Sequence, residues 1–184
     1  MTLANWLTVL RIVLIPFFVS ALIYREPGWA LAFFISAIVT DALDGFVARR
    51  TQVTSLGRFL DPLADKLLLA TAFVLLPILD GIPVWVTVVV VSRDVIIGLG
   101  YLLLYLHWGS TQIKVRPLGK ITTFLQSVCV GGALLNMLLA GPEWMSIYLA
   151  YLAALATAGS GIDYILQGVL RANQLAGSRK SGAD

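Results

Sequence analysis

Six long apolar runs constrain the fold of this chain more than any other feature. Hydrophobic residues make up 59% of its 184 residues, whereas about 45–50% is usual for a soluble domain. Each run reaches the ~20 residues that a helix needs to cross the hydrocarbon of a bilayer. The runs cover residues 6–24, 29–48, 60–79, 84–106, 118–140 and 144–168. We therefore predict an all-α, polytopic membrane protein with six transmembrane helices.

The positions of the basic residues predict the orientation of these helices. Three connections, those after the first, third and fifth runs, hold Arg25 as their single basic residue. Basic residues gather instead in the second and fourth connections and in the tail: Arg49, Arg50 and Arg58; Lys114, Arg116 and Lys120; Arg171, Arg179 and Lys180. Because cytoplasmic loops carry an excess of Lys and Arg, we predict that this second set, and both termini, face the cytoplasm.

We predict that the chain forms one domain followed by a short tail. Residues 1–171 form the predicted membrane domain, and residues 172–184 are polar, small and weakly patterned, which is typical of a disordered terminus. The single cysteine, Cys129, lies within an apolar run. With no second cysteine to pair with, it is expected to be a small buried hydrophobe.

Residues 41–65 concentrate carboxylates in an otherwise apolar chain. Asp41 and Asp44 are spaced i,i+3, and Asp61 and Asp65 are spaced i,i+4, so each pair shares one face of a helix. Four like charges on adjacent helix ends would repel one another strongly. Something positive must lie between them, and Mg²⁺ is a hard cation that takes carboxylate oxygens and leaves positions for water or phosphate. We therefore predict a two-metal centre.

Small residues and an arginine accompany these acids. Gly45, Ala48 and Gly57 permit either close helix packing or a ligand lying against the backbone. Arg49 offers a guanidinium fork to a diphosphate or to a base edge. Metal-bridged phosphates, an arginine clamp and a carboxylate free to act as a base together indicate a site for phosphoryl or phosphatidyl transfer.

Two further arginines lie inside apolar runs and each admits two interpretations. Arg11 either extends to the headgroups or, together with Asn5, reaches a polar cavity near the carboxylates. Arg93 either balances a carboxylate of another helix or binds an anionic substrate. Adjacent helical residues point about 100° apart, so Arg93 need not pair with Asp94. Asp163 is a candidate partner for Arg93.

The fourth connection carries a basic cluster, Lys114, Arg116 and Lys120. It is either an orientation signal that also attracts anionic lipids or a phosphate pocket beside the carboxylates. Polar side chains follow it that could hydrogen-bond a ligand or simply a neighbouring helix: Thr122, Thr123 and Gln126.

The pattern D41-x2-D44-G45-x2-A48-R49-x7-G57-x3-D61-x3-D65 resembles the signature of the CDP-alcohol phosphotransferase (phosphatidyltransferase) family. The usual gap between the Ala-Arg pair and the glycine is eight residues, and here it is seven. The NWLTVLR opening also resembles the family, and six spans is its usual count. DPLADK resembles the bacterial phosphatidylglycerophosphate synthases and the eukaryotic-type cardiolipin synthases, whereas SRD at 92–94 favours the cardiolipin synthases.

The resemblance implies an enzyme that transfers a group from a CDP-linked lipid to an alcohol and releases CMP, with Mg²⁺ or Mn²⁺ as cofactor. Asp41, Asp44 and Asp61 would ligate metal, and Asp65 would complete the metal site and act as the general base. The CDP moiety would be contacted by Asp44 and by the small residues and arginine of the signature: Gly45, Ala48, Arg49 and Gly57.

The expected partners are CDP-diacylglycerol, an alcohol acceptor, membrane lipids and a second copy of the chain, with no nucleic acid. The expected location is the bacterial inner membrane, with the active site facing the cytoplasm. Glycerol 3-phosphate is the first acceptor and phosphatidylglycerol the alternative, while inositol phosphate and serine stay open. A membrane prenyltransferase would carry its acids in two distant connections, and a small cation or proton transporter would carry them near the midplane of several helices.

Overall fold

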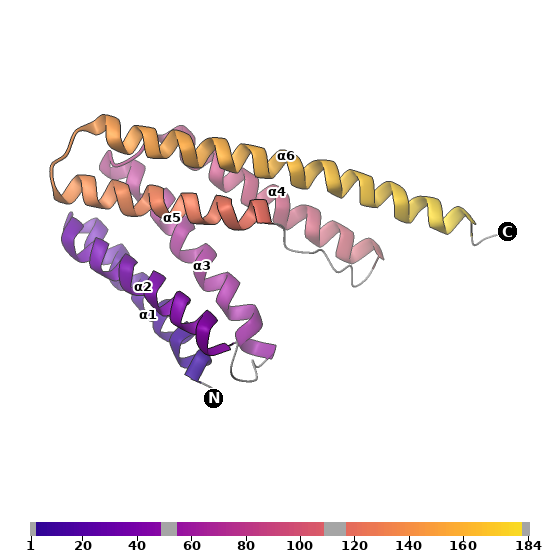
Figure 1. Cartoon of the computed structure of the whole chain (residues 1–184), viewed down its shortest axis with the longest axis horizontal. Coiled ribbons are helices and arrows are strands. Elements are labelled where there is room, and N and C mark those ends of the chain that lie inside the picture. Colours follow the sequence, from indigo (N-terminus) through magenta and orange to yellow (C-terminus); the bar gives the residue numbers. More distant parts are fainter. Residues whose placement is uncertain (1–2, 49–54, 109–116, 182–184) are drawn as a thin grey trace.

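The computed structural model describes the backbone of residues 3–48, 55–108 and 117–181. Within these ranges the chain forms six α-helices and one short 3₁₀-helix (Figure 1). Their bounds are α1 Leu3–Ile23, α2 Pro27–Ala48, α3 Ser55–Leu75, η1 Leu76–Leu79, α4 Val84–Trp108, α5 Pro117–Leu138 and α6 Glu143–Ser181. Each helix covers one of the six apolar runs, so the predicted all-helical class is confirmed.

Three tight turns, which follow α1, η1 and α5, connect consecutive helices as hairpins. The turn residues Arg25, Asp80 and Ala140 have φ values of 56°, 58° and 48°, which is the left-handed conformation that commonly ends a helix. Each turn is closed by a backbone hydrogen bond from a later N–H to a carbonyl of the preceding helical turn: Glu26 to Ala21 at 2.9 Å, Gly81 to Leu76 at 2.8 Å and Gly141 to Asn136 at 2.9 Å. A proline follows shortly after each turn, where its fixed φ favours starting the next helix.

The helices pack as two groups that share a core. α1 contacts α2 and α3, while α6 contacts α4 and α5, and α2 joins the groups through its contact with α5. Figure 1 shows the two groups diverging away from the short turns. Fully buried apolar side chains from both groups form one cluster, which includes Phe18, Phe34, Phe73, Leu134 and Ala150.

Polar side chains tie α5 to α6. Gln126 Nε2 donates to Thr157 Oγ1 at 3.0 Å, and Thr122 Oγ1 donates to the carbonyl of Ala156 at 3.2 Å. Such bonds stabilise helix pairs in membranes. For Thr122 and Gln126 the structure therefore favours the helix-packing interpretation over a ligand contact.

Length and hydropathy alone qualify three helices of the described part as membrane-spanning: Trp6–Ile23, Leu118–Leu138 and Glu143–Leu170. The apolar part of α2, Pro27–Leu43, is shorter than this. The six-span topology and the side of the termini therefore stay predictions.

α6 continues to Ser181, where the sequence predicted a disordered tail. The segment contains Ala, Gln, Leu and Arg and no proline, which lets the helix continue.

Candidate active site

Arg11 brings the two halves of the acidic stretch together. Its Nη1 lies 2.7 Å from Oδ1 of Asp65 on α3, and its Nη2 lies 3.0 Å from Oδ1 of Asp41 on α2. One guanidinium on α1 therefore bridges carboxylates from two other helices. Arg11 thus contacts the carboxylates, as one of its two interpretations predicted, while the side chain of Asn5 lies outside the described residues. In the sequence, the sign of this contact is a single arginine in an apolar run. The carboxylates that it contacts lie far away in the chain, so the sequence alone does not identify them.

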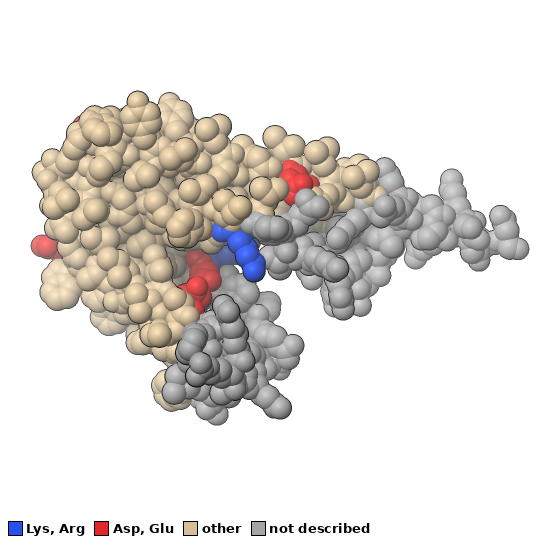
Figure 2. Space-filling view, in the orientation of Figure 1, with Lys and Arg blue, Asp and Glu red and all other residues tan. Residues whose placement is uncertain are grey.

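The side chains of the two aspartates are partly exposed, whereas the side chain of Arg11 is fully buried. The Arg11 side chain is 0% exposed, whereas those of Asp41 and Asp65 are 51% and 38% exposed. Figure 2 shows acidic and basic atoms next to each other in a notch of the surface between the two helix groups. Their exposure leaves both carboxylates open to a ligand.

The described donors fit a hard divalent cation. Asp41 and Asp65 present carboxylate oxygens that converge on one cationic group, which is the donor type that Mg²⁺ and Mn²⁺ accept. The side chains of Asp44 and Asp61 lie outside the described residues, although their backbones belong to α2 and α3. Among the residues described, no group of three or more His, Cys, Asp or Glu forms a metal site.

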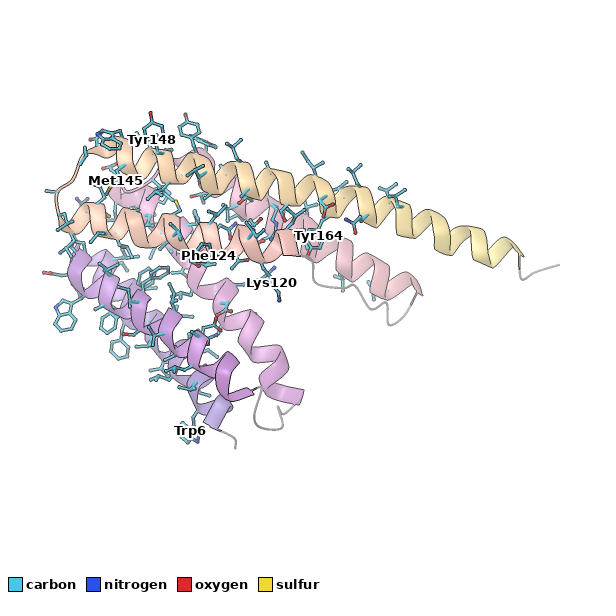
Figure 3. The ribbon with its side chains drawn as sticks, in the orientation of Figure 1. Trp6, Lys120, Phe124, Met145, Tyr148 and Tyr164 are labelled. Atoms are coloured by element: carbon cyan, nitrogen blue, oxygen red, sulfur yellow. The ribbon has the colours of Figure 1, made fainter. Side chains whose placement is uncertain are left out.

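Several other predicted site residues lie outside the described part. These are the side chain of Ala48, the surroundings of Gly45 and Gly57, whose backbones belong to α2 and α3, and the whole of Arg49, Lys114 and Arg116. Lys120 is described: it is exposed on the first turns of α5. Figure 3 shows its side chain extending from α5 toward the side of the notch where α3 lies. One member of the basic cluster is therefore exposed on the side of α5 where α3 lies.

Arg93 forms a second polar cluster, between α4 and α6. Its Nη1 lies 2.7 Å from Oδ1 of Asp94, so these two neighbours do pair, although the helical geometry did not require it. Its Nη2 donates to Ser160 at 2.8 Å, and its guanidinium lies 5.6 Å from the centre of the Tyr164 ring. Asp163 accepts a hydrogen bond from Gln167 at 2.8 Å. Arg93 is thus paired with a carboxylate of its own helix and hydrogen-bonded to α6, whereas the structural interpretation expected a carboxylate from another helix.

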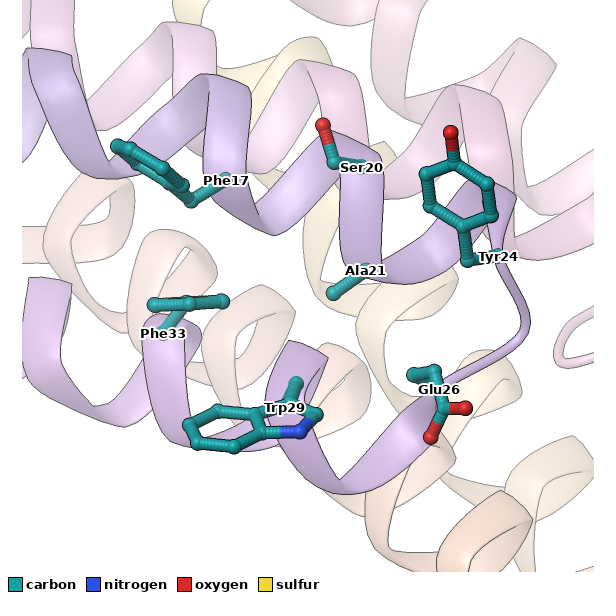
Figure 4. Close-up of a pocket in the computed structure, with 7 residues that line it drawn as sticks. All are labelled: Phe17, Ser20, Ala21, Tyr24, Glu26, Trp29 and Phe33. Carbon is teal, nitrogen blue, oxygen red and sulfur yellow. The ribbon is translucent and has the colours of Figure 1, made fainter.

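A groove between α1 and α2 lies at the other end of these helices, near the Arg25 turn. It is lined by Phe17, Ser20, Ala21, Tyr24, Glu26, Trp29 and Phe33 (Figure 4). The rings of Phe17 and Phe33 are 5.9 Å apart and those of Trp29 and Phe33 6.0 Å apart. Glu26 is the single ionisable carboxylate in this lining, so the groove does not offer the paired acids of the notch.

Fold and site together define a class: a bundle of apolar helices in which carboxylates from two helices meet one buried arginine. The comparison with known proteins names the family. The sequence model of the CDP-alcohol phosphatidyltransferase family matches residues 1–158, a range that holds every predicted site residue. The chain belongs to this family, and its apolar helices agree with an integral membrane protein.

Proteins similar to this chain include some named for the synthesis of phosphatidylglycerophosphate and one named as a cardiolipin synthase. A protein of Mycobacterium tuberculosis (strain ATCC 25618 / H37Rv), named probable phosphatidylglycerophosphate synthase, is 36% identical over 89% of this chain and 79% of its own length. A CDP-diacylglycerol–glycerol-3-phosphate 3-phosphatidyltransferase of Haemophilus influenzae is 36% identical over 87% of this chain and 89% of its own. A probable cardiolipin synthase (CMP-forming) of Drosophila melanogaster is 32% identical over 90% and 57%.

Proposed function

We propose that this enzyme transfers the phosphatidyl group of CDP-diacylglycerol to glycerol 3-phosphate and releases CMP. The relatives from M. tuberculosis and H. influenzae support this acceptor by their names. The observation that carries the proposal is the convergence of Asp41 and Asp65 on Arg11, because it brings both ends of the acidic signature to one place.

Asp65 is the proposed general base. The hydroxyl of the acceptor has a pKa far above 7, so it needs a base nearby to become nucleophilic. The hydroxyl oxygen of the acceptor bonds to the phosphorus on the lipid side, and the hydroxyl proton passes to Asp65. The bond from this phosphorus to the oxygen that joins the two phosphates breaks. The electron pair of that bond leaves with CMP. The 38% exposure of the Asp65 side chain keeps the carboxylate accessible to an acceptor in the notch.

Asp41, Asp44, Asp61 and Asp65 would hold two Mg²⁺ or Mn²⁺ ions. When bound, these ions offset the negative charge of the diphosphate and of the departing CMP. The proposed contacts to the CDP moiety come from Asp44 and from the residues that follow it in the signature: Gly45, Ala48, Arg49 and Gly57. Glycines let the nucleotide approach the backbone.

The basic cluster Lys114, Arg116 and Lys120 is proposed to bind the phosphate of the acceptor. A phosphate suits both the lysine charges and an arginine fork. Phosphatidylglycerol also carries a phosphate, and the relative from D. melanogaster, named as a cardiolipin synthase, favours it as the second candidate acceptor. The cluster does not separate these two acceptors.

The proposed setting is the bacterial inner membrane, with six spans, both termini and the site on the cytoplasmic side, and a homodimer as the assembly. The distribution of Lys and Arg supports the orientation. A site at this interface lets the soluble nucleotide leave while the acyl chains stay in the bilayer.

An assay with purified protein tests the proposal. CDP-diacylglycerol and Mg²⁺ are supplied with glycerol 3-phosphate, phosphatidylglycerol, serine or inositol phosphate, and CMP release is followed together with the lipid product. We expect turnover with glycerol 3-phosphate and formation of phosphatidylglycerophosphate. Turnover with phosphatidylglycerol alone would assign the second candidate instead, and CMP release with none of the four acceptors would refute the proposal.

A further inference from the structure

Arg11 is the largest fully buried side chain in the described part of the protein. It lies on α1 among apolar residues, where a charged group is costly unless it is paired and hydrogen-bonded. Both of its described ion-pair partners are proposed metal ligands, on α2 and on α3. A guanidinium can reach both because its nitrogens are held in a rigid fork, whereas a lysine presents a point charge.

We infer that Arg11 acts as a built-in counter-cation, which holds Asp41 and Asp65 together without metal and weakens the binding of divalent cations to them. This inference rests on the proposed function, because it takes both aspartates to be metal ligands. Arg11 is a positioning residue in this role, since it acts through the carboxylates.

The sign of the effect follows from charge. With four carboxylates and one guanidinium the site has a formal charge of −4 + 1 = −3. Without Arg11 it is −4, so a divalent cation is attracted more strongly and the metal-free site repels itself more. Removing the positive charge should therefore tighten metal binding and destabilise the metal-free protein. A residue with a purely structural role would lower stability without tightening the binding of metal.

The test uses the unfolding temperature of the full-length protein in detergent, titrated with MnCl₂ from a metal-free sample. Wild type is compared with Arg11→Gln, which removes the charge, and with Arg11→Lys, which keeps it. The matched control is Arg93→Gln, which removes another largely buried arginine that is paired elsewhere.

We expect Arg11→Gln to have a lower unfolding temperature without metal and a half-saturating Mn²⁺ concentration at least about tenfold below that of wild type. Arg11→Lys should stay within about threefold of wild type, since its charge is kept. Arg93→Gln should leave the half-saturating concentration unchanged. A half-saturating concentration for Arg11→Gln that equals or exceeds that of wild type would overturn the inference.

Two outcomes separate this inference from the proposed metal centre. If wild type shows no shift of the unfolding temperature with Mn²⁺ or Mg²⁺, the metal centre itself fails. If Arg11→Gln can be recovered folded with MnCl₂ present throughout purification but not without it, the inference is supported, because the metal replaces the missing charge. Failure to fold under both conditions, repeated with the apolar variant Arg11→Met, would refute it.

Discussion

The two described aspartates of the site differ in surroundings although they share one arginine. Asp65 receives the shorter contact from Arg11, 2.7 Å against 3.0 Å, and its side chain is less exposed than that of Asp41. Arg11 engages Oδ1 of each carboxylate. Asp65 is thus held more firmly, which suits a group that must be aligned with a reacting hydroxyl.

Replacing Asp65 by Asn should abolish transfer while leaving metal-dependent binding of CDP-diacylglycerol largely intact. The amide keeps the shape of the side chain but cannot take a proton, and a general base typically contributes 10²- to 10⁴-fold to the rate. CMP release gives the rate, and equilibrium binding of CDP-diacylglycerol with and without Mg²⁺ gives the binding. Activity close to that of wild type would show that another group is the base.

Replacing Asp41 by Ala should remove the metal dependence of activity. The variant loses one proposed ligand and also one of the two described ion-pair partners of Arg11, which keeps its contact with Asp65. The loss of stability should therefore stay below the about 3–5 kcal/mol that is typical when a buried charge is left uncompensated. Mg²⁺ titrations of CMP release measure the first effect and thermal unfolding the second. Glu26→Gln, which removes an exposed carboxylate at the other end of the α1–α2 hairpin, is the control and should titrate like wild type. An unchanged Mg²⁺ titration in Asp41→Ala would count against ligation.

At this scale the sequence predicted the acids, and it offered the contact of Arg11 with them as one of two interpretations. Asp41 and Asp65 follow from a local pattern, because spacing on a helix fixes which side chains share a face. The Arg11–Asp65 contact links residues 54 positions apart, and no local periodicity encodes such a distance. The Arg93–Asp94 pair was left open by the sequence, because helical geometry fixes the Cβ direction but not where a long side chain ends.

At the scale of elements, the apolar runs predicted the six helices because a membrane-length helix leaves a strong composition signal. The ends of the helices were predicted less accurately than their number. The third run was predicted as one span over 60–79, whereas the chain forms α3 and then η1 before the Asp80 turn. Pro77 explains this change, since proline interrupts the regular hydrogen bonding of an α-helix. The extension of α6 to Ser181 was missed because a polar helix has no apolar signal.

The α5–α6 pair supplies a prediction at this scale. Gln126→Ala removes the buried hydrogen bond to Thr157 and should destabilise the protein by about 0.6–1.7 kcal/mol, the range for such bonds between membrane helices. The matched control is Ser127→Ala, whose hydroxyl donates within α5 to the carbonyl of Thr123. Unfolding of both variants in mixed micelles measures the difference, and equal stabilities would show that the interhelical bond contributes nothing measurable.

At the scale of the whole molecule, the groups proposed to bind the two substrates come from both helix groups. The α1–α3 group carries the carboxylates, and α5 of the other group carries Lys120 at its start (Figures 2 and 3). A substrate with a diphosphate and an acceptor with its own phosphate can be placed between them, so that each group recognises a different part of the reacting pair. We therefore predict that the phosphate of the acceptor is bound on the α5 side.

Lys120→Ala should therefore raise the KM for glycerol 3-phosphate by about tenfold, the equivalent of about 1.4 kcal/mol, and leave the KM for CDP-diacylglycerol near its wild-type value. A charge-assisted hydrogen bond to phosphate is strong enough to account for this loss. Lys120→Arg keeps the charge and should retain most of the affinity, and added salt should weaken acceptor binding in wild type more than in Lys120→Ala. Initial rates of CMP release, with each substrate varied in turn, separate the two KM values. If both rose equally, Lys120 would serve the orientation of the chain in the membrane and not the recognition of the acceptor.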